Sequence, residues 1–396
     1  MSKNVVFCAD GTWSGPGQPD SDDTPQPTNV FKLYVNLEGK EASDTAQSGK
    51  ERERTLTLAD GSVRQIAKYL HGVGDSENFI ARILGGAIGA GLIARIVRGY
   101  TFLSRNYTAG DRIFIIGFSR GAYTARALAG LVAAKGLLDA TKLDLADKTQ
   151  TYRLGAAVWY EHRRDRLQSN KSLLGELEDI VIDLPGFFTR PPPDDQLVAA
   201  PIEAVAVWDT VGALGIPEYN LQKTRVDSFQ FADLALDPKV SRGFHAIAVD
   251  ERREDFTPTL WDPDPRITQA LFPGCHGDVG GGNPEAESGL SDGPLRWLTA
   301  QLAHQGVLFK TPADGVGGPD ARAMLHRPWI SAVWKGLPSG PRVFPDGLCL
   351  SRSVLDRIAA GNVPVEGGDA PAPYRPANLV DYVNGEAAVT GVVVVA

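Results

Sequence analysis

The fold is indicated most clearly by the stretch Asp111-Arg-Ile-Phe-Ile-Ile-Gly-Phe-Ser119-Arg-Gly-Ala122. In it an apolar segment ends at Ser119 and a helix-forming segment begins directly after it. Residues Arg112–Ile116 predict a buried strand, and the Ala-, Leu- and Arg-rich residues Arg120–Lys135 predict the helix that follows it. A serine in so sharp a turn adopts a strained backbone, and glycines two residues before and after it remove the Cβ atoms that would clash. The pattern therefore predicts a nucleophile elbow that presents Ser119. The alternative is an ordinary glycine-rich turn, since the chain has 43 glycines.

The composition is that of a globular protein, with 396 residues of which 43% are hydrophobic. Such a chain can bury a large core. The formal net charge is -8 and no block of basic residues occurs, which argues against nucleic acid as a partner. The three cysteines, Cys8, Cys275 and Cys349, are far apart and form no CxxC pair, which favours a reducing compartment and buried thiols.

Strand patterns alternate with helix patterns along the chain. Besides the strand before Ser119, strands are predicted at Val5–Ala9, Gln65–Leu70, Ile202–Trp208, Gly243–Val249 and Ile267–Phe272. Helices are predicted at Asn29–Leu37, about Asn78–Tyr107, Pro294–Gln305 and about Val354–Ala360. This alternation predicts an α/β fold with a mostly parallel central sheet of about six strands and helices on both faces. The polar stretch that ends near Arg54 is predicted as an exposed loop.

One domain is expected over residues 1–396. Residues 139–200 are charged and aromatic and close in three prolines, which predicts a cap or lid inserted after the elbow helix. Residues 306–396 are rich in Gly and Pro and predict a C-terminal segment that wraps around the domain. The N-terminal residues lack the apolar core of a signal peptide, and Ile83–Val97 is too short and too charged for a membrane span. We expect a cytoplasmic protein without a transmembrane segment, with signal-independent export and peripheral membrane contact left open.

A serine hydroxyl needs a base, and the base needs an acid that orients it. Among six histidines, His276 has the best position, in a glycine-rich loop directly after the last predicted strand. Two aspartates follow earlier strands, and both satisfy the order Ser, Asp, His along the chain. Asp209 is favoured because it lies in a tight turn, and Asp250 is the alternative because it also ends a strand. His245 is predicted to be a buried sheet histidine.

An oxyanion hole requires two backbone N–H donors near the nucleophile. The amide of Arg120 is one candidate, and the loop that contains Gly11 and Thr12 is placed to supply the other. Asp10 is predicted to pin that loop through its side chain, and His71 follows a strand end where it can line the site.

Three other interpretations remain. Gly89-Ala-Gly91-Leu-Ile-Ala94 has dinucleotide-binding spacing, but the pattern around it is helical. A metal-dependent hydrolase could use Asp10, His276 and Asp278, but the sequence has no HExxH motif. The fold could also serve as a non-catalytic binding module. The sequence predicts neither a cofactor nor a metal and does not indicate an oligomeric state.

Six motifs together resemble an α/β-hydrolase family of largely unknown function that includes the GxSxG phospholipase effectors of type VI secretion systems. They are Phe7-Cys-Ala-Asp-Gly-Thr-Trp13, Tyr69-Leu-His-Gly-Val-Gly74, Gly117-Phe-Ser-Arg-Gly-Ala-Tyr-Thr-Ala-Arg126, Trp208-Asp-Thr-Val-Gly212, His245-Ala-Ile-Ala-Val-Asp-Glu-Arg-Arg253 and Pro273-Gly-Cys-His-Gly-Asp-Val-Gly-Gly-Gly282. The resemblance implies an α/β-hydrolase-like fold and a Ser/Asp/His esterase or lipase that acts on small-molecule or lipid esters, phospholipids among them. Residue by residue, it supports Ser119, Asp209 and His276.

Overall fold

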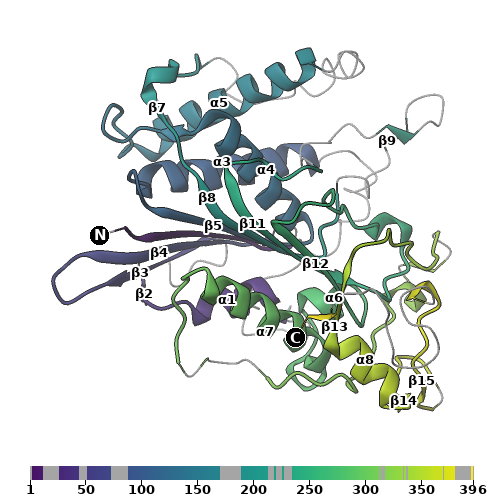
Figure 1. Cartoon of the computed structure of the whole chain (residues 1–396). Helices are drawn as coiled ribbons and strands as arrows, with labels where there is room; N and C mark the ends of the chain where they lie inside the picture. Colours follow the sequence, from purple (N-terminus) through teal and green to yellow (C-terminus); the bar gives the residue numbers. More distant parts are fainter. Residues whose placement is uncertain are drawn as a thin grey trace.

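The structure is a computed structural model with an open central sheet and helices above and below it (Figure 1). It describes residues 2–11, 26–43, 51–72, 88–169, 189–212, 218–219, 225–226, 234–311, 313, 317–332, 334–335, 338–368, 370–379 and 394–395. No helix within these ranges is long and apolar enough to cross a membrane.

The central sheet has ten strands in the order β16-β13-β12-β11-β8-β5-β1-β4-β3-β2. All six predicted strands are present: β1 (Asn4–Ala9), β4 (Val63–Leu70), β5 (Arg112–Phe118), β8 (Ile202–Trp208), β11 (Val240–Ala248) and β12 (Ile267–Phe272). The four additional ones are β2 (Lys40–Glu41), β3 (Glu51–Thr57), β13 (Cys349–Ser351) and β16 (Val394–Val395). The eight strands from β4 to β16 run parallel, β3 runs antiparallel to β4, and β2 pairs antiparallel with β3. The predicted α/β fold with a mostly parallel sheet is confirmed, but the predicted number of strands is too low.

The prediction of an exposed loop up to Arg54 is wrong, because strand β3 occupies its last residues. Charged residues alternate along β3, and Lys68 on β4 forms ion pairs with Glu51 and Glu53, at 2.6 and 3.1 Å. Cross-strand pairs of opposite charge stabilise a strand with little apolar character. Charged side chains are also common near sheet edges, where they discourage pairing with another chain.

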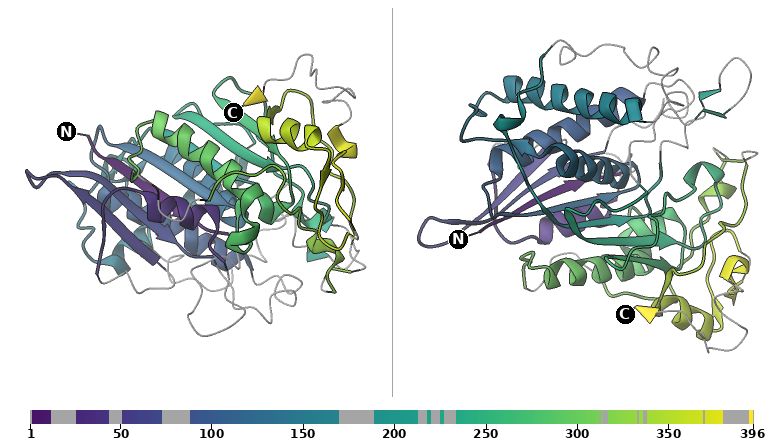
Figure 2. Two further views of the ribbon diagram at one scale, coloured as in Figure 1. Left: turned by 90° about the horizontal axis from the view of Figure 1, so that it is seen from below. Right: turned by 45° about the horizontal axis from the view of Figure 1, so that its top comes forward.

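Two helical layers cover the sheet. Helices α3 (Ile88–Asn106), α4 (Arg120–Lys135) and α5 (Lys148–Ser169) lie on one face, and α1 (Asn29–Asn36) and α7 (Gly289–His304) lie on the other (Figures 1 and 2). Side chains of the parallel strands therefore point into a core on both faces. In β1, Val5, Phe7 and Ala9 belong to the α3/α4 core, and the alternating Val6 and Cys8 belong to the α1/α7 core.

A third apolar cluster joins β11 and β12 to the C-terminal part of the chain. It contains Ile247 and Leu271 from these strands, with Leu350 from β13 and Val354 from helix α8 (Arg352–Ala359). Helix α8 is a further element that the sequence predicted.

Smaller elements complete the description. They are the one-turn helix α6 (His276–Gly280), the strand pairs β6 (Leu137–Leu138) with β7 (Leu197–Val198), β9 (Glu218–Tyr219) with β10 (Arg225–Val226), and β14 (Asn362–Val363) with β15 (Ala372–Pro373), and the 3-10 helices Asp194–Gln196, Glu254–Phe256, Glu285–Glu287, Pro328–Ile330 and Ala377–Leu379.

Helix α5 lies within the predicted cap and packs against α3 and α4, and β7 and the 3-10 helix Asp194–Gln196 lie in the same range. Residues 170–188 lie outside the described ranges, so the action of 139–200 as a lid stays a prediction.

Candidate active site

Ser119 lies at the carboxyl end of β5 and precedes the first residue of α4. Its backbone has φ 57° and ψ -124°, in the left-handed range that residues with a Cβ avoid. The Ser119 N–H donates to the carbonyl of Trp208 on β8, at 3.1 Å. Such strain in a residue between a strand and a helix is the backbone geometry of a nucleophile elbow.

The two motif glycines allow the close packing that this turn requires. A Cβ at Gly121 would lie 2.1 Å from the carbonyl oxygen of Ala9, and one at Gly117 would lie 2.4 Å from the carbonyl oxygen of Gly121. Real Cβ atoms do not approach backbone this closely. The helix after Ser119 can therefore start directly against the end of β1 only because both positions lack a side chain.

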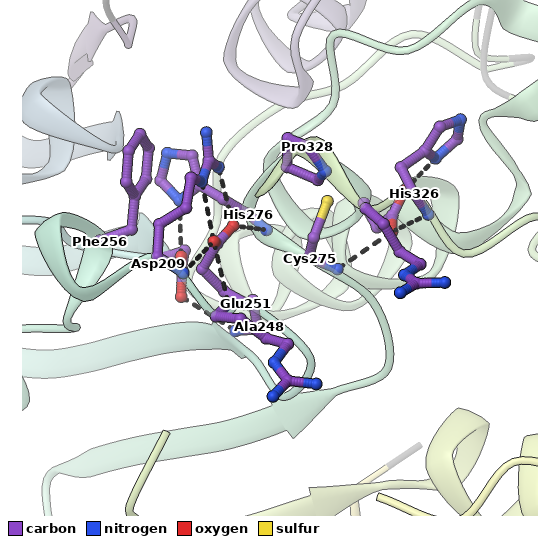
Figure 3. A network of polar contacts seen from close by, with 12 residues as sticks. Asp209, Ala248, Glu251, Phe256, Cys275, His276, His326 and Pro328 are labelled. Carbon is purple, nitrogen blue, oxygen red and sulfur yellow. Dashed lines mark hydrogen bonds and ion pairs between the residues drawn. The ribbon is translucent and has the colours of Figure 1, made fainter. Parts of the chain in front are cut away.

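His276 and Asp209 are in direct contact at the same edge of the sheet (Figure 3). The Nδ1 of His276, the first residue of α6, lies 2.6 Å from Oδ2 of Asp209, which follows β8. The two residues are 67 positions apart in the chain, and their strands β8 and β12 are separated in the sheet by β11 alone. Because Nδ1 of His276 bonds to Asp209, Nε2 is the nitrogen of the ring that can accept a proton.

Packing brings the His276 ring to the elbow. The ring of Phe118, the residue before Ser119, lies 4.6 Å from the His276 ring between centroids, and Phe256 contacts the imidazole edge-on at 4.9 Å. Within the described residues the Ser119 hydroxyl makes no hydrogen bond to His276. Catalytic hydrogen bonds are often long without substrate and tighten when it binds.

Several hydrogen-bond donors stabilise the negative charge of the Asp209 carboxylate. Its side chain is fully buried, and Oδ1 accepts the N–H of Ala248 at 2.9 Å. Both oxygens also accept from Arg342, Oδ1 from Nη1 at 2.7 Å and Oδ2 from Nη2 at 2.9 Å. Burial acts to raise the pKa of Asp209, but the Arg342 charge and the hydrogen bonds from Arg342 and His276 outweigh it and hold the pKa well below its ordinary value.

The pKa of His276 lies below its ordinary value because burial opposes the charged form, although Asp209 acts in the opposite direction. The His276 N–H donates to the buried carboxylate of Glu251 at 3.1 Å, which fixes the start of α6. Glu251 in turn accepts from Arg253, whose guanidinium stacks 3.6 Å above the centre of the Phe256 ring. The imidazole is therefore neutral at neutral pH and restrained on several sides.

Asp250 has a different role in the structure. Its Oδ2 accepts the N–H of Gly274 at 2.7 Å and the hydroxyl of Tyr374 at 2.8 Å. Burial raises the pKa of Asp250 to about 6. This carboxyl therefore ties the loop before His276 to the C-terminal part of the chain, and the carboxylate in contact with the imidazole is that of Asp209.

The loop after β1 lies against the elbow. A Cβ at Gly11 would lie 3.2 Å from Cβ of Ser119, but the Gly11 N–H donates to Asp10 Oδ1 at 2.7 Å rather than pointing at an open position. Asp10 also accepts from the hydroxyls of Thr28 and Tyr69, at 2.8 and 2.6 Å, and burial raises its pKa to about 6. Asp10 thus holds this loop through its side chain.

Other predicted site residues are only partly described. Thr12 lies outside the described residues. The carbonyl oxygens of His71 and Asp10 both accept from Arg95, which places the end of β4 beside the end of β1. Burial and the nearby Arg95 lower the pKa of Arg120 to about 9. The predicted sheet histidine, His245, is fully buried and accepts the N–H of Thr210 at 3.0 Å.

Sequence reasoning missed Arg342, Glu251 and His326. Arg342 lies in the Gly- and Pro-rich tail, where no periodic pattern or motif marks it. His326 bonds through Nδ1 to Asp278 at 2.5 Å and through Nε2 to Glu287 at 2.8 Å. Although burial acts to lower it, these bonds raise the pKa of His326 to about 9. Asp278 also accepts the Cys275 N–H, so this network fixes the start of α6.

The described residues contain no group of three or more His, Cys, Asp or Glu side chains that could hold a metal ion. The two aspartates of the metal hypothesis are engaged elsewhere, Asp10 with Thr28 and Tyr69, and Asp278 with His326. Gly89–Ala94, the segment with dinucleotide-binding spacing, lies inside helix α3.

Residues 3–301 match the family described as the catalytic domain of Tle1-like phospholipase effectors of the type VI secretion system. The chain belongs to this family. The match contains Ser119, Asp209 and His276 and stops before Arg342. Membership supports a hydrolase of the lipase and phospholipase kind at the level of the family, and it agrees with the family that the six sequence motifs resemble.

The chain is also similar to one yeast protein and to two solved structures. The chain is 28% identical over 269 residues to the uncharacterized protein YEL023C of Saccharomyces cerevisiae, covering 67% of this chain and 33% of the yeast protein. One solved structure is a Tle1 effector bound to the VgrG spike of the Type 6 secretion system, with TM-score 0.40, 16% identity, and coverage of 73% and 53% of the two chains. Another, an uncharacterized protein from Pseudomonas aeruginosa, has TM-score 0.39, 16% identity, and coverage of 81% and 48%. The chain thus spans a third to a half of the length of these relatives.

Proposed function

We propose that this protein is a serine hydrolase that cleaves carboxylic esters, phospholipid acyl esters among them, through an acyl-enzyme on Ser119. The observation that carries the proposal is the 2.6 Å contact between His276 Nδ1 and a buried, ionised Asp209, at the sheet edge where Ser119 occupies a strained elbow. A base oriented by a carboxylate is the arrangement that activates a serine hydroxyl. The lipid part of the proposal rests on the family.

In the first half of the reaction, Nε2 of His276 accepts the Ser119 proton while Oγ attacks the ester carbonyl. Asp209 stabilises the imidazolium and fixes the tautomer that carries a proton on Nδ1. The tetrahedral intermediate collapses, the imidazolium gives its proton to the leaving alcohol, and an ester of Ser119 remains. Water then attacks this ester, with His276 again as base, and releases the carboxylic acid and free Ser119.

The negative oxygen of the intermediate requires N–H donors. Arg120 directly follows Ser119 and is the first residue of α4, so its backbone amide lies at the amino end of the helix beside the nucleophile. The dipole of a helix N-terminus adds to this stabilisation. We propose Arg120 as one donor and retain Thr12 as the candidate for the second, because the Gly11 amide already donates to Asp10. Gly11 then contributes by allowing the loop to approach Ser119.

The test replaces Ser119 with alanine, with Ser331→Ala as the matched control because Ser331 is an exposed serine outside the site. We expect Ser119→Ala to lose hydrolysis of short p-nitrophenyl esters and release of fatty acid from phospholipid vesicles, while the circular dichroism spectrum is retained. Ser331→Ala should keep wild-type rates. Wild-type activity in Ser119→Ala would refute the proposal, and a folded wild-type protein without esterase activity would favour a binding module.

A further inference from the structure

One arginine connects the candidate catalytic acid to a distant part of the chain. The guanidinium of Arg342 donates from Nη1 and Nη2 to the two oxygens of Asp209, and it also donates to the carbonyl oxygens of Ala248, at 2.7 Å, and Phe256. Arg342 is only 7% exposed. A forked pair between guanidinium and carboxylate fixes orientation as well as charge.

Backbone contacts determine where Arg342 lies. Residues Arg253 and Ser339 form an isolated antiparallel bridge, the Gly340 N–H donates to the carbonyl of Arg252 at 2.8 Å, and the Glu254 N–H donates to the carbonyl of Pro338 at 3.3 Å. The segment that carries Arg342 is therefore attached to the turn after β11, which also carries Glu251. The side chain reaches Asp209 from a fixed backbone.

We propose that Arg342 is a positioning residue that keeps Asp209 ionised and turned toward His276, so that a segment beyond the family match completes the active site. The inference rests on the proposed function. Among the described residues each oxygen of Asp209 has two donors: Oδ1 accepts from Ala248 and Arg342, and Oδ2 accepts from His276 and Arg342. Loss of Arg342 removes one donor from each oxygen and the only fixed positive charge among them.

The consequence for His276 follows from the charges around it. Asp209 contacts the ring, Glu251 and Arg253 approach from the turn after β11, and Asp278 lies in the same short helix. Without Arg342 the buried Asp209 keeps the Ala248 N–H, and the imidazole is the cation that remains in contact with it among the described residues. The pair then binds its proton more tightly, and the pH at which His276 loses that proton moves upward.

Arg357 offers a matched control. It is a fully buried arginine of the same C-terminal part of the chain, and its guanidinium donates to the carbonyl oxygens of Ala321, Ala323 and Pro364 and stacks over Tyr374. It makes no hydrogen bond to Asp209 or His276. A variant of Arg357 therefore measures what the loss of a buried arginine does to the fold alone.

The experiment compares Arg342→Met and Arg357→Met with the wild-type chain by two measurements. The pH profile of kcat/KM gives the acid limb of activity, and the histidine NMR resonances, with His276 assigned from a His276→Asn variant, give the same titration without catalysis. We expect Arg342→Met to lower kcat by more than tenfold with a smaller change in KM, and to raise the His276 midpoint by about one pH unit or more. In Arg357→Met the midpoint should equal that of the wild type.

A wild-type midpoint and profile in folded Arg342→Met would overturn the inference. If Arg342→Met does not fold, Arg342→Lys decides, because lysine keeps the charge but cannot fork; wild-type kcat in that variant would equally overturn it. In Arg342→Ala, added methylguanidinium should restore part of the lost kcat, and it should have no effect on Arg357→Ala. The NMR midpoint distinguishes failure of the Arg342 inference from failure of the proposed esterase function. It reports the effect of Arg342 on His276 even if the wild-type chain proves inactive toward esters.

Discussion

Two aspartates at neighbouring strand ends lie in opposite electrostatic environments. Asp209 is paired with Arg342 and His276, and its pKa lies well below the ordinary value in spite of burial. Asp250 bonds to an amide and a tyrosine hydroxyl, and burial raises its pKa to about 6. A carboxylate that must stabilise an imidazolium needs the first environment, because only an ionised acid lowers the energy of the cation.

Substitution of these two aspartates by asparagine separates their roles. We expect Asp209→Asn to lower kcat by about 10⁴, the loss seen when the acid of a serine-protease triad is replaced in this way. Asp250→Asn should lower kcat by less than about tenfold, since Asp250 does not contact the imidazole and its hydrogen bonds go to the Gly274 N–H and the Tyr374 hydroxyl. Steady-state ester hydrolysis by the two purified variants measures both losses. A larger loss in Asp250→Asn would reverse the assignment.

The pH dependence of activity follows from the lowered pKa of His276. A histidine whose pKa is depressed stays neutral, and so remains a base, as the pH falls past the ordinary value of about 6.5. We therefore expect kcat/KM to be constant from neutral pH down to about 6.5 and to fall only below it. A pH profile with a stable substrate measures this limb. An acid midpoint above 7 would contradict the burial that lowers this pKa.

Ser119 and both candidate acids could be predicted because each comes at the end of a predicted strand, and His276 because it lies in the glycine-rich loop after the last one. The sequence favours Asp209 but keeps Asp250 as an alternative acid. The two aspartates both end strands, and their hydrogen-bond partners, which distinguish them, are not visible in the sequence. Arg342 could not be predicted, because its contact with Asp209 depends on where a segment without periodicity lies against the sheet edge.

Among the elements, the junction of β5 and α4 depends on two glycines. The Gly121 position illustrates the constraint, since its Cβ would lie 2.1 Å from the Ala9 carbonyl oxygen. The amino end of α4 therefore packs directly on the end of β1, and the helix presents its first amide beside Ser119.

Alanine substitution in two helices tests this packing. Gly121→Ala should destabilise the protein by about 1–3 kcal/mol or more, because the backbone must shift to admit the methyl group. Gly293→Ala is the control: apart from its own helix backbone and chain neighbours, no described atom lies within 4 Å of a Cβ added at Gly293 in α7. The change in stability should be less than about 1 kcal/mol, because the gain in helix propensity is opposed by the following Pro294. Urea unfolding measures both, and equal stability of the two variants would contradict the argument.

Element prediction succeeded where apolar periodicity was strong and failed where charge or short length concealed it. Strand β3 has charges of alternating sign, and their partners are Lys68 on β4 and Glu41 on β2, so its sequence resembles that of a loop. The segment after His276 was interpreted as a glycine-rich loop, but Asp278 caps it by accepting the Cys275 N–H, and one helical turn forms.

For the whole molecule, three apolar clusters share the strands of one sheet. The C-terminal cluster packs Leu350 and Val354 against Ile247 and Leu271 of the central strands. We propose that residues beyond the family match belong to the same folding unit as the site, as the predicted single domain over 1–396 requires. Composition predicts that residues 306–396 wrap around the domain, but it does not predict which of them pack against the core, because the sequence pattern has no period there.

Leu350→Ala tests whether the C-terminal part of the chain and the site unfold together. Leu350 is fully buried, and its truncation should cost about 2–5 kcal/mol. Because the cluster includes β11 and β12, esterase activity and tryptophan fluorescence should be lost at one urea concentration, lower than in the wild type. Two separate transitions would show that the C-terminal part unfolds independently.

The site of covalent reaction with an alkyl fluorophosphonate tests most directly whether Ser119 is the activated nucleophile. Peptide mapping by mass spectrometry after reaction should locate a single phosphonyl group on Ser119, and the Ser119→Ala protein should remain unmodified. An adduct on another residue, or a folded wild-type protein that does not react, would contradict the account.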